Sequence, residues 1–220
     1  FKTPLSAIYH HAQLLQMEGN LDEKQSGYVD NILDSSKRMS DLIQNMLKLN
    51  KLEKQTIRPV AEHYDVCAQL SECAVMFEDS WEKKNIDFAV EMEDRAYVDA
   101  DPGLMELVWN NLLSNAIKFT PEGGTILLSQ RSDEEQVIVS VKDTGCGMTE
   151  DVMEHIFDKF YQGDESHAML GNGLGLALVK RVLELSDARI EVTSKPEEGT
   201  ELRVILPKKN ESDAILLAEE

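Results

Sequence analysis

The sequence predicts a helical hairpin followed by a mixed α/β domain, on three observations. Apolar residues recur at alternating spacings of four and three over residues 1–50, which is the pattern of packed helices. Helical periodicity stops between Gln55 and His63, a stretch that contains Pro59. Beyond it, helical segments and short alternating segments follow one another. We therefore expect a hairpin over residues 1–54, a linker over 55–63, an α/β domain over 64–207 and an acidic tail over 208–220.

The first two helices are expected to pair in an antiparallel hairpin. The seam of the first is Phe1, Leu5, Ile8, Ala12 and Leu15. Asn20 and Glu23 have the spacing of a capping box for the second. The apolar face of the second is Val29, Ile32, Met39, Ile43 and Met46, and Ser36 fills the gap, where it permits close approach of the helices. One hairpin cannot cover both seams, so we expect a dimeric four-helix bundle through residues 1–54.

The α/β domain is expected to alternate between helices and strands. The elements are a helix over 66–83 with Leu70, Ala74, Phe77 and Trp81 inward, strands over 86–92 and 96–98, a helix from Pro102, strands over 125–131 and 136–142, a long irregular region, a helix over 176–185, and a hairpin over 190–194 and 200–206. Val137, Val139 and Val141 should form the buried face of their strand.

Composition restricts the classes of partner. The formal net charge of the 220 residues is −19, which argues against nucleic acid or an anionic membrane as the main partner. Cys67, Cys73 and Cys146 lack metal-ligand spacing and leave an odd thiol, so we expect reduced cysteines in a cytosolic protein. No apolar run is long enough to span a membrane, and no signal peptide is visible. Because the chain begins at Phe1 without methionine, we expect a fragment of a longer protein.

The helix after Asp101 carries the first candidate site. Asp101 can cap its N-terminus, with Pro102 at the first helical position. Asn111, Asn115 and Lys118 follow at spacings of four and three and share one face. An amide oxygen can ligate magnesium and a lysine can bind phosphate, so the stripe suits a metal-bound phosphate compound. The alternative is a solvated polar stripe.

Two glycine-rich segments follow. Asp143 to Gly147 ends a strand and begins a turn, which is either a plain turn or a site where a carboxylate accepts a hydrogen bond from the amino group of a base. Gly171 to Leu176 leads into a helix, which is either a flexible cap or an anion site. This second segment matches neither the dinucleotide-binding fingerprint nor the Gly-Lys-Ser/Thr phosphate loop.

Aromatic residues precede the second glycine segment. Phe157, Phe160 and Tyr161 are core residues or anchors of a lid formed by the run 162–170. On the first helix, His10 and His11 have no carboxylate at helical spacing before Glu18, so we interpret them as partly exposed residues of the bundle.

In their order, these segments resemble the catalytic core of a two-component sensor histidine kinase over residues 1–207. Residues 111–120 resemble the asparagine box of that family, residues 143–147 and 171–176 its first two glycine boxes, and residues 157–160 its phenylalanine box. Gly199 and Thr200 resemble its last glycine motif, and residues 1–5 the end of the box that holds the phospho-accepting histidine. By this alignment that histidine would immediately precede Phe1, so we expect this chain to lack it.

The resemblance implies a dimerisation and phosphotransfer hairpin followed by a catalytic ATP-binding domain, a two-layer α/β sandwich with a mixed sheet. It implies that Asn115, with Asn111 beside it, binds Mg²⁺, that Lys118 contacts phosphate, and that Asp143 binds the adenine amino group. Thr3 would position water for dephosphorylation of the partner. The implied ATP-binding residues are Asn111, Asn115, Lys118, Phe119, Asp143, Gly145, Gly147, Phe160, Gly171, Gly173, Leu174, Gly175, Leu176 and Thr200.

The implied activity is transfer of the terminal phosphoryl group of ATP to a histidine of the hairpin and then to an aspartate of a response-regulator receiver domain. The chain would be the cytoplasmic portion of a membrane-anchored protein. Two alternatives stay open, namely a non-catalytic dimeric module that binds nucleotide, and another ATPase with the same pocket, which the hairpin disfavours. Phe119 replaces a frequent tyrosine, and Gln162 replaces a frequent arginine that would contact the terminal phosphate.

Overall fold

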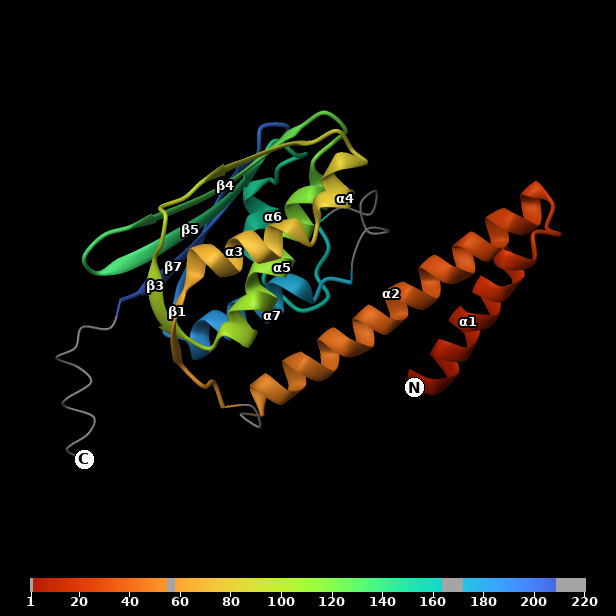
Figure 1. Cartoon of the computed structure of the whole chain (residues 1–220), viewed down its shortest axis with the longest axis horizontal. Helices are drawn as coiled ribbons and strands as arrows, with labels where there is room; N and C mark the ends of the chain where they lie inside the picture. Colours follow the sequence, from red (N-terminus) through yellow and green to blue (C-terminus); the bar gives the residue numbers. More distant parts are fainter. Residues whose placement is uncertain (1, 55–57, 164–171, 209–220) are drawn as a thin grey trace.

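The computed structural model describes residues 2–54, 58–163 and 172–208, and it begins with a helical hairpin (Figure 1). Helix α1 (Lys2–Glu18) and helix α2 (Glu23–Glu53) lie side by side and antiparallel. Ala12 of α1 and Val29 and Ser36 of α2 are buried in the single chain. The small Ser36 thus sits in the helix contact, as the sequence predicts.

The start of α2 differs from the sequence prediction. Asp22, and not Asn20, is the N-cap, and its side chain accepts a hydrogen bond from the Gln25 backbone N–H at 2.8 Å. The Gln25 side chain accepts in return from the Asp22 N–H at 3.0 Å. The motif is a capping box two residues later than expected, because Asp at the cap and Gln at the third position satisfy the same two donors.

The rest of the chain builds a mixed sheet. Its five strands are β2 (Asp87–Glu91), β4 (Thr125–Ser132), β5 (Gln136–Asp143), β6 (Arg189–Lys195) and β7 (Gly199–Pro207), in the order β2-β4-β5-β7-β6. β2 runs parallel to β4, and the other neighbours are antiparallel. A separate antiparallel pair is formed by β1 (Glu62–Asp65) and β3 (Tyr97–Ala100).

Helices form the second layer (Figure 1). They are α3 (Val66–Val75), α4 (Glu78–Glu82), α5 (Pro102–Phe119), α6 (Glu150–His155) and α7 (Gly175–Leu185). The core lies between the layers, and Val137, Val139 and Val141 of β5 are buried in it as predicted. The predicted helical hairpin and two-layer α/β sandwich with a mixed sheet are therefore confirmed. Within the described ranges, no helix combines the length and apolarity needed to cross a membrane.

The end of α2 belongs to the same core. Leu49 and Leu52 are buried among its residues, and α2 contacts α7. The C-terminal end of the hairpin therefore packs against the α/β layers.

Three local predictions were wrong. The expected linker 55–63 overlaps β1, which pairs with β3 although its own sequence is polar. The expected helix 66–83 is interrupted between Val75 and Glu78, where Phe77 begins a second short helix. The expected irregular region contains α6, which Thr149 caps by accepting from the Val152 N–H at 3.4 Å.

Candidate functional site

Helix α5 begins at a capping carboxylate, as predicted. Asp101 Oδ1 accepts a hydrogen bond from the Leu104 N–H at 3.0 Å, and Pro102 lies in the first turn. From there the helix buries one face, made of Leu104, Met105, Val108, Trp109, Leu112, Leu113, Ala116 and Ile117. This buried face fixes the rotation of the helix, and with it the direction of its polar side chains.

The predicted polar stripe of α5 is half-buried and meets α7. Asn111 Nδ2 donates to the Leu107 carbonyl at 2.6 Å. A Cβ added at Gly175 would lie 2.6 Å from Asn111 Oδ1, so the backbone at the start of α7 approaches this amide closely. Asn115 follows one turn later and is also half-buried. The structure therefore brings the asparagine helix and the second glycine segment together.

Lys118 completes the stripe in an environment that disfavours its charge. Burial lowers the pKa of the Lys118 ammonium to about 8, and the positive charge of Arg38 on α2 acts in the same direction. Its Nζ lies 4.2 Å from the centroid of the Phe119 ring. A half-buried ammonium beside a second cation favours an anion as its partner.

Asp143 ends β5 inside the molecule. Its side chain is only 7% exposed, and its Oδ1 accepts from the Gly145 N–H at 2.8 Å. Burial raises the pKa of this carboxyl, and hydrogen bonds from the Gly145 and Thr200 backbone N–H groups oppose that shift. A Cβ at Gly145 would lie 2.8 Å from the Phe119 carbonyl oxygen, so the glycine permits α5 to approach. The carboxylate is buried although it ends a strand, because β5 is the central strand of the sheet.

The turn after Asp143 packs against the β6–β7 hairpin. Gly147 has a φ of +63°, and a Cβ there would overlap the Lys195 carbonyl. Gly199 has a φ of +97° and lies against the Asp143 carbonyl, and Thr200 pairs with Asp143 in the ladder. The first glycine segment and the Gly199–Thr200 motif, separate in the sequence, are thus neighbours.

The aromatic segment is tied to the second glycine segment. The Phe160 N–H donates to the Gly173 carbonyl at 2.8 Å, and both residues have positive φ. The Phe160 side chain is 57% exposed, which contradicts a core role for it, whereas Phe157 is half-buried. Leu174 is buried, and its N–H donates to Asn172 Oδ1 at 3.2 Å.

Other predicted residues are placed less completely. Leu176 is half-buried in the first turn of α7. The Thr3 side chain, Gly171 and most of the run 162–170 lie outside the described residues. His10 and His11 are exposed on α1.

A cavity of about 430 Å³ opens at the C-terminal end of α5. Its lining residues come from the asparagine helix, the first glycine segment and two further turns, and they are Lys84, Lys118, Phe119, Thr120, Pro121, Thr144, Gly145, Cys146 and Glu197. A second cavity, of about 380 Å³, is lined by Phe77, Ser80, Lys84, Ser114, Ile117 and Lys118. Lys84 and Lys118 line both. Lys84 was not among the residues predicted from the sequence. It belongs to no motif, and the sequence shows only that it is a basic residue shortly before a strand.

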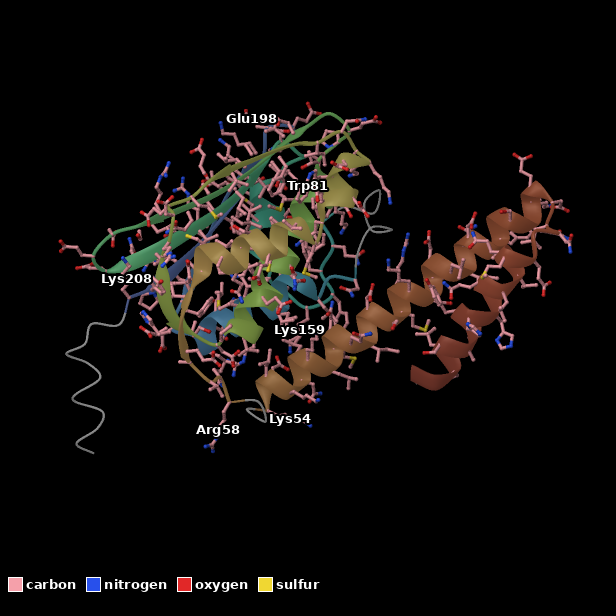
Figure 2. The ribbon with its side chains drawn as sticks, in the orientation of Figure 1. Lys54, Arg58, Trp81, Lys159, Glu198 and Lys208 are labelled. Carbon is pink, nitrogen blue, oxygen red and sulfur yellow. The ribbon has the colours of Figure 1, made fainter. Side chains whose placement is uncertain are left out.

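The hairpin contacts the same region. Lys159 of the aromatic segment lies beside the C-terminal part of α2 (Figure 2), where its Nζ forms an ion pair of 2.5 Å with Glu53. Arg181 of α7 donates to the Leu52 carbonyl at 3.4 Å and pairs with Glu184 at 3.1 Å. The end of α2 therefore contacts both segments that flank the second glycine motif.

Comparison with known families gives two matches along the chain. Residues 100–210 match the model of the histidine kinase-, DNA gyrase B- and HSP90-like ATPases. Residues 1–55 match the model of the His Kinase A (phospho-acceptor) domain. The sensor protein CreC of Escherichia coli (strain K12) is 34% identical over 198 residues, which are 90% of this chain and 41% of CreC. The chain thus spans less than half the length of this relative.

Solved structures of similar chains include kinases with bound partners. Full-length ShkA in complex with AMPPNP is 27% identical with a TM-score of 0.76, over 94% of this chain and 44% of ShkA. Histidine kinase ThkA in complex with the response regulator protein TrrA is 25% identical with a TM-score of 0.71, over 94% of this chain and 58% of ThkA.

The buried position of Asp143 predicts an effect on stability. Asp143→Ala should lower the free energy of unfolding by about 1–3 kcal/mol, because the Gly145 N–H loses its acceptor. Asp143→Asn keeps an acceptor oxygen of the same shape and should cost less than about 1 kcal/mol. Urea denaturation of the three proteins measures this, and an Asp143→Ala protein as stable as wild type would contradict the geometry.

Proposed function

The chain belongs to the sensor histidine kinases, within the histidine kinase-, DNA gyrase B- and HSP90-like ATPases, and from that premise we propose that it is the ATP-dependent phosphotransfer core of such a kinase. The observation that carries the proposal is the close approach of the α5 polar stripe to the glycine at the start of α7. Amides, an ammonium and helix N-terminal backbone then converge, which suits a magnesium-bound phosphate chain.

The two parts of the chain have different roles in this proposal. Residues 1–54 form the dimerisation and phosphotransfer hairpin, and residues 64–207 form the ATP-binding domain. The AMPPNP complex of ShkA supports nucleotide binding by this fold, and the ThkA–TrrA complex supports a response regulator as partner. The receiver domain of that regulator is the acceptor of the phosphoryl group.

Adenine binds at the end of β5. The Asp143 carboxylate accepts a hydrogen bond from the adenine amino group, because its second oxygen is not used by the Gly145 N–H. Gly145, which lines the larger cavity, and Gly147 border the base. The absence of side chains at both lets this turn pack against the backbone of Phe119 and Lys195. Phe119 and Thr200 flank this site.

The phosphates bind along the polar stripe. Asn115 would offer an amide oxygen to Mg²⁺, with Asn111 beside it, and Lys118 would contact phosphate. The described residues contain no group of three or more His, Cys, Asp or Glu side chains suited to a metal. Mg²⁺ usually takes few protein ligands and keeps phosphate oxygens and water, and here it would neutralise charge on the phosphates. Phe160 and the glycines 171, 173 and 175, with Leu174 and Leu176, border the phosphates.

In the reaction, the bond between the terminal phosphorus of ATP and its bridging oxygen breaks, and a phosphorus–nitrogen bond forms to a histidine of the hairpin. ADP leaves with the bridging oxygen, and the histidine proton is released. The phosphoryl group then passes to an aspartate of the regulator. The chain contributes positioning and charge neutralisation. Thr3 would position water for a separate reaction, in which the aspartyl phosphate of the regulator is hydrolysed to aspartate and inorganic phosphate.

Magnesium-dependent ATP binding tests the proposal. The wild-type chain should bind ATP in the presence of Mg²⁺ and bind it more weakly in EDTA, as measured by isothermal titration. Asn115→Asp adds a charge next to phosphate and loses a donor, and should weaken binding about tenfold or more. Asn31→Asp, on the exposed surface of α2, is the matched control. A wild-type chain that binds no ATP would overturn the proposed function.

The lowered pKa of Lys118 predicts a pH dependence. The pKa of Lys118 is about 8. At a pH below this value the ammonium is charged and binds phosphate, and at a higher pH the charge is lost. ATP affinity should therefore fall between pH 7 and 9.5, by up to about tenfold per pH unit above the pKa. Lys118→Arg stays protonated over this range and should give a flatter profile. Equal profiles for the two proteins would contradict a phosphate contact by Lys118.

Dimerisation through the hairpin is the third part of the proposal. Large apolar side chains are exposed on the single hairpin, and they are Ile8, Leu14, Leu15, Met17, Tyr28, Ile32, Met39, Met46 and Leu47. So many exposed apolar groups on two adjacent helices favour pairing with a second copy.

A charge in this surface should therefore separate the copies. Ile8 is 53% exposed, and Ile8→Glu would place a carboxylate in the paired surface. Sedimentation equilibrium should show a wild-type dimer and a folded Ile8→Glu monomer, while Asp30→Asn on α2 leaves the dimer intact. A wild-type monomer at high protein concentration would exclude this interface.

A further inference from the structure

We propose that Lys84 is a positioning residue for nucleotide binding, which holds the C-terminal turn of α5 so that Lys118 is aimed at the phosphates. The inference rests on the proposed function, because it assigns Lys84 a role through Lys118. Lys84 lies outside every motif of the sequence analysis, in the turn between α4 and β2.

The ammonium of Lys84 is surrounded by backbone carbonyls. Its Nζ donates to the carbonyl oxygens of Ile117 at 2.8 Å, Lys118 at 3.0 Å and Thr120 at 2.9 Å. An ammonium has three donors, so each is used once. The carbonyls belong to the end of α5, where the helix dipole favours positive charge. One side chain therefore caps a helix that is more than thirty residues away in the sequence.

The end of α5 needs this outside donor. Helices often end at a glycine with left-handed backbone, whose own N–H groups satisfy the last carbonyls. Here the C-cap is Thr120 with extended backbone (φ −71°, ψ 128°), and Pro121 follows with no N–H. The Thr120 N–H and hydroxyl both donate hydrogen bonds to the Ala116 carbonyl, so neither is available to the later carbonyls. The Ile117 and Lys118 carbonyls thus receive from Lys84 what a backbone cap would otherwise supply.

The backbone near Lys84 holds the following loop as well. The Lys84 carbonyl accepts from the Gly123 N–H at 2.9 Å, and the Asp87 N–H donates to the Gly124 carbonyl at 2.9 Å. The turn before β2 and the loop after α5 are therefore joined by these backbone hydrogen bonds as well as by the Lys84 side chain. Lys118, at the end of this helix, lines both cavities, and Phe119 lines the larger one.

This arrangement matters for Lys118 in particular. Lys118 is half-buried and lines both cavities, and one of the carbonyls that Lys84 binds is its own. Asn115 and Asn111 lie one and two turns before Lys118, respectively, and are fixed by the buried face of α5. Loss of the Lys84 cap should therefore affect the phosphate contact more than adenine recognition at Asp143.

A double-mutant cycle measures the coupling. The full 220-residue chain is prepared as wild type, Lys84→Met, Lys118→Met and the double variant, with Lys83→Met as the matched control on the neighbouring exposed lysine. Affinities for Mg-AMPPNP and for adenosine are measured by isothermal titration, and folding is checked by circular dichroism. Lys84→Arg, which keeps the charge and several donors in a different geometry, is measured in parallel.

Lys84→Met should weaken AMPPNP binding about tenfold while adenosine affinity changes less than about threefold. Adding it to Lys118→Met should cause little further loss, since both act on the same contact. Lys83→Met should bind as wild type, and Lys84→Arg should be intermediate.

Equal losses for AMPPNP and adenosine, additive effects of the two lysines, or wild-type affinity in folded Lys84→Met would each overturn the positioning role. If Lys84→Met does not fold, wild-type AMPPNP affinity in Lys84→Arg overturns it. Failure of the wild-type chain to bind AMPPNP would instead count against the proposed function itself.

Discussion

The site depends on one constraint, which is that α5 must bury a full apolar face under the sheet while its adjacent edge stays polar. Trp109 and Leu112 are completely buried, so the helix cannot rotate without exposing them. The Trp109 indole N–H is satisfied by Gln69 at 2.8 Å, which removes the cost of burying it. With the rotation fixed, the direction of Asn111 and Asn115 is fixed as well. The last turn, with Lys118, is held in addition by the hydrogen bonds of Lys84 to its carbonyls. The functional stripe is thus oriented by the core and by the end of the helix, not by contacts among its own residues.

The other parts of the site reach α5 because glycine permits close approach. At Gly145 and Gly175, any side chain would enter the space of Phe119 or Asn111. Gly145 lies in the turn after β5 and meets the end of α5, and Gly175 begins α7 and meets the middle of α5. The end of α2 then packs on α7 through Leu49 and Leu52.

Much of this architecture could be predicted from local sequence. The cap at Asp101, the alternation of Val137, Val139 and Val141 and the small residue Ser36 are signals within a few residues, and each proved correct. Features set by distant contacts could not be found in this way. β1 is polar and forms only because β3 pairs with it. Asp143 is buried because β7 pairs beside β5 and places Thr200 opposite it. Lys84 caps carbonyls that lie far along the chain. The site residues could be named from motifs, but their burial and partners required the fold.

The central claim is that the polar stripe of α5 contacts the nucleotide, and the side-chain amides of that stripe report on it directly. In a nitrogen–proton correlation spectrum of the labelled chain, the NH₂ signals of Asn111 and Asn115 should shift when Mg-AMPPNP is added. The signal of Asn31, exposed on α2, should not move. Saturating Mg-AMPPNP that leaves the Asn111 and Asn115 signals in place, with shifts confined to other parts of the chain, would contradict the account.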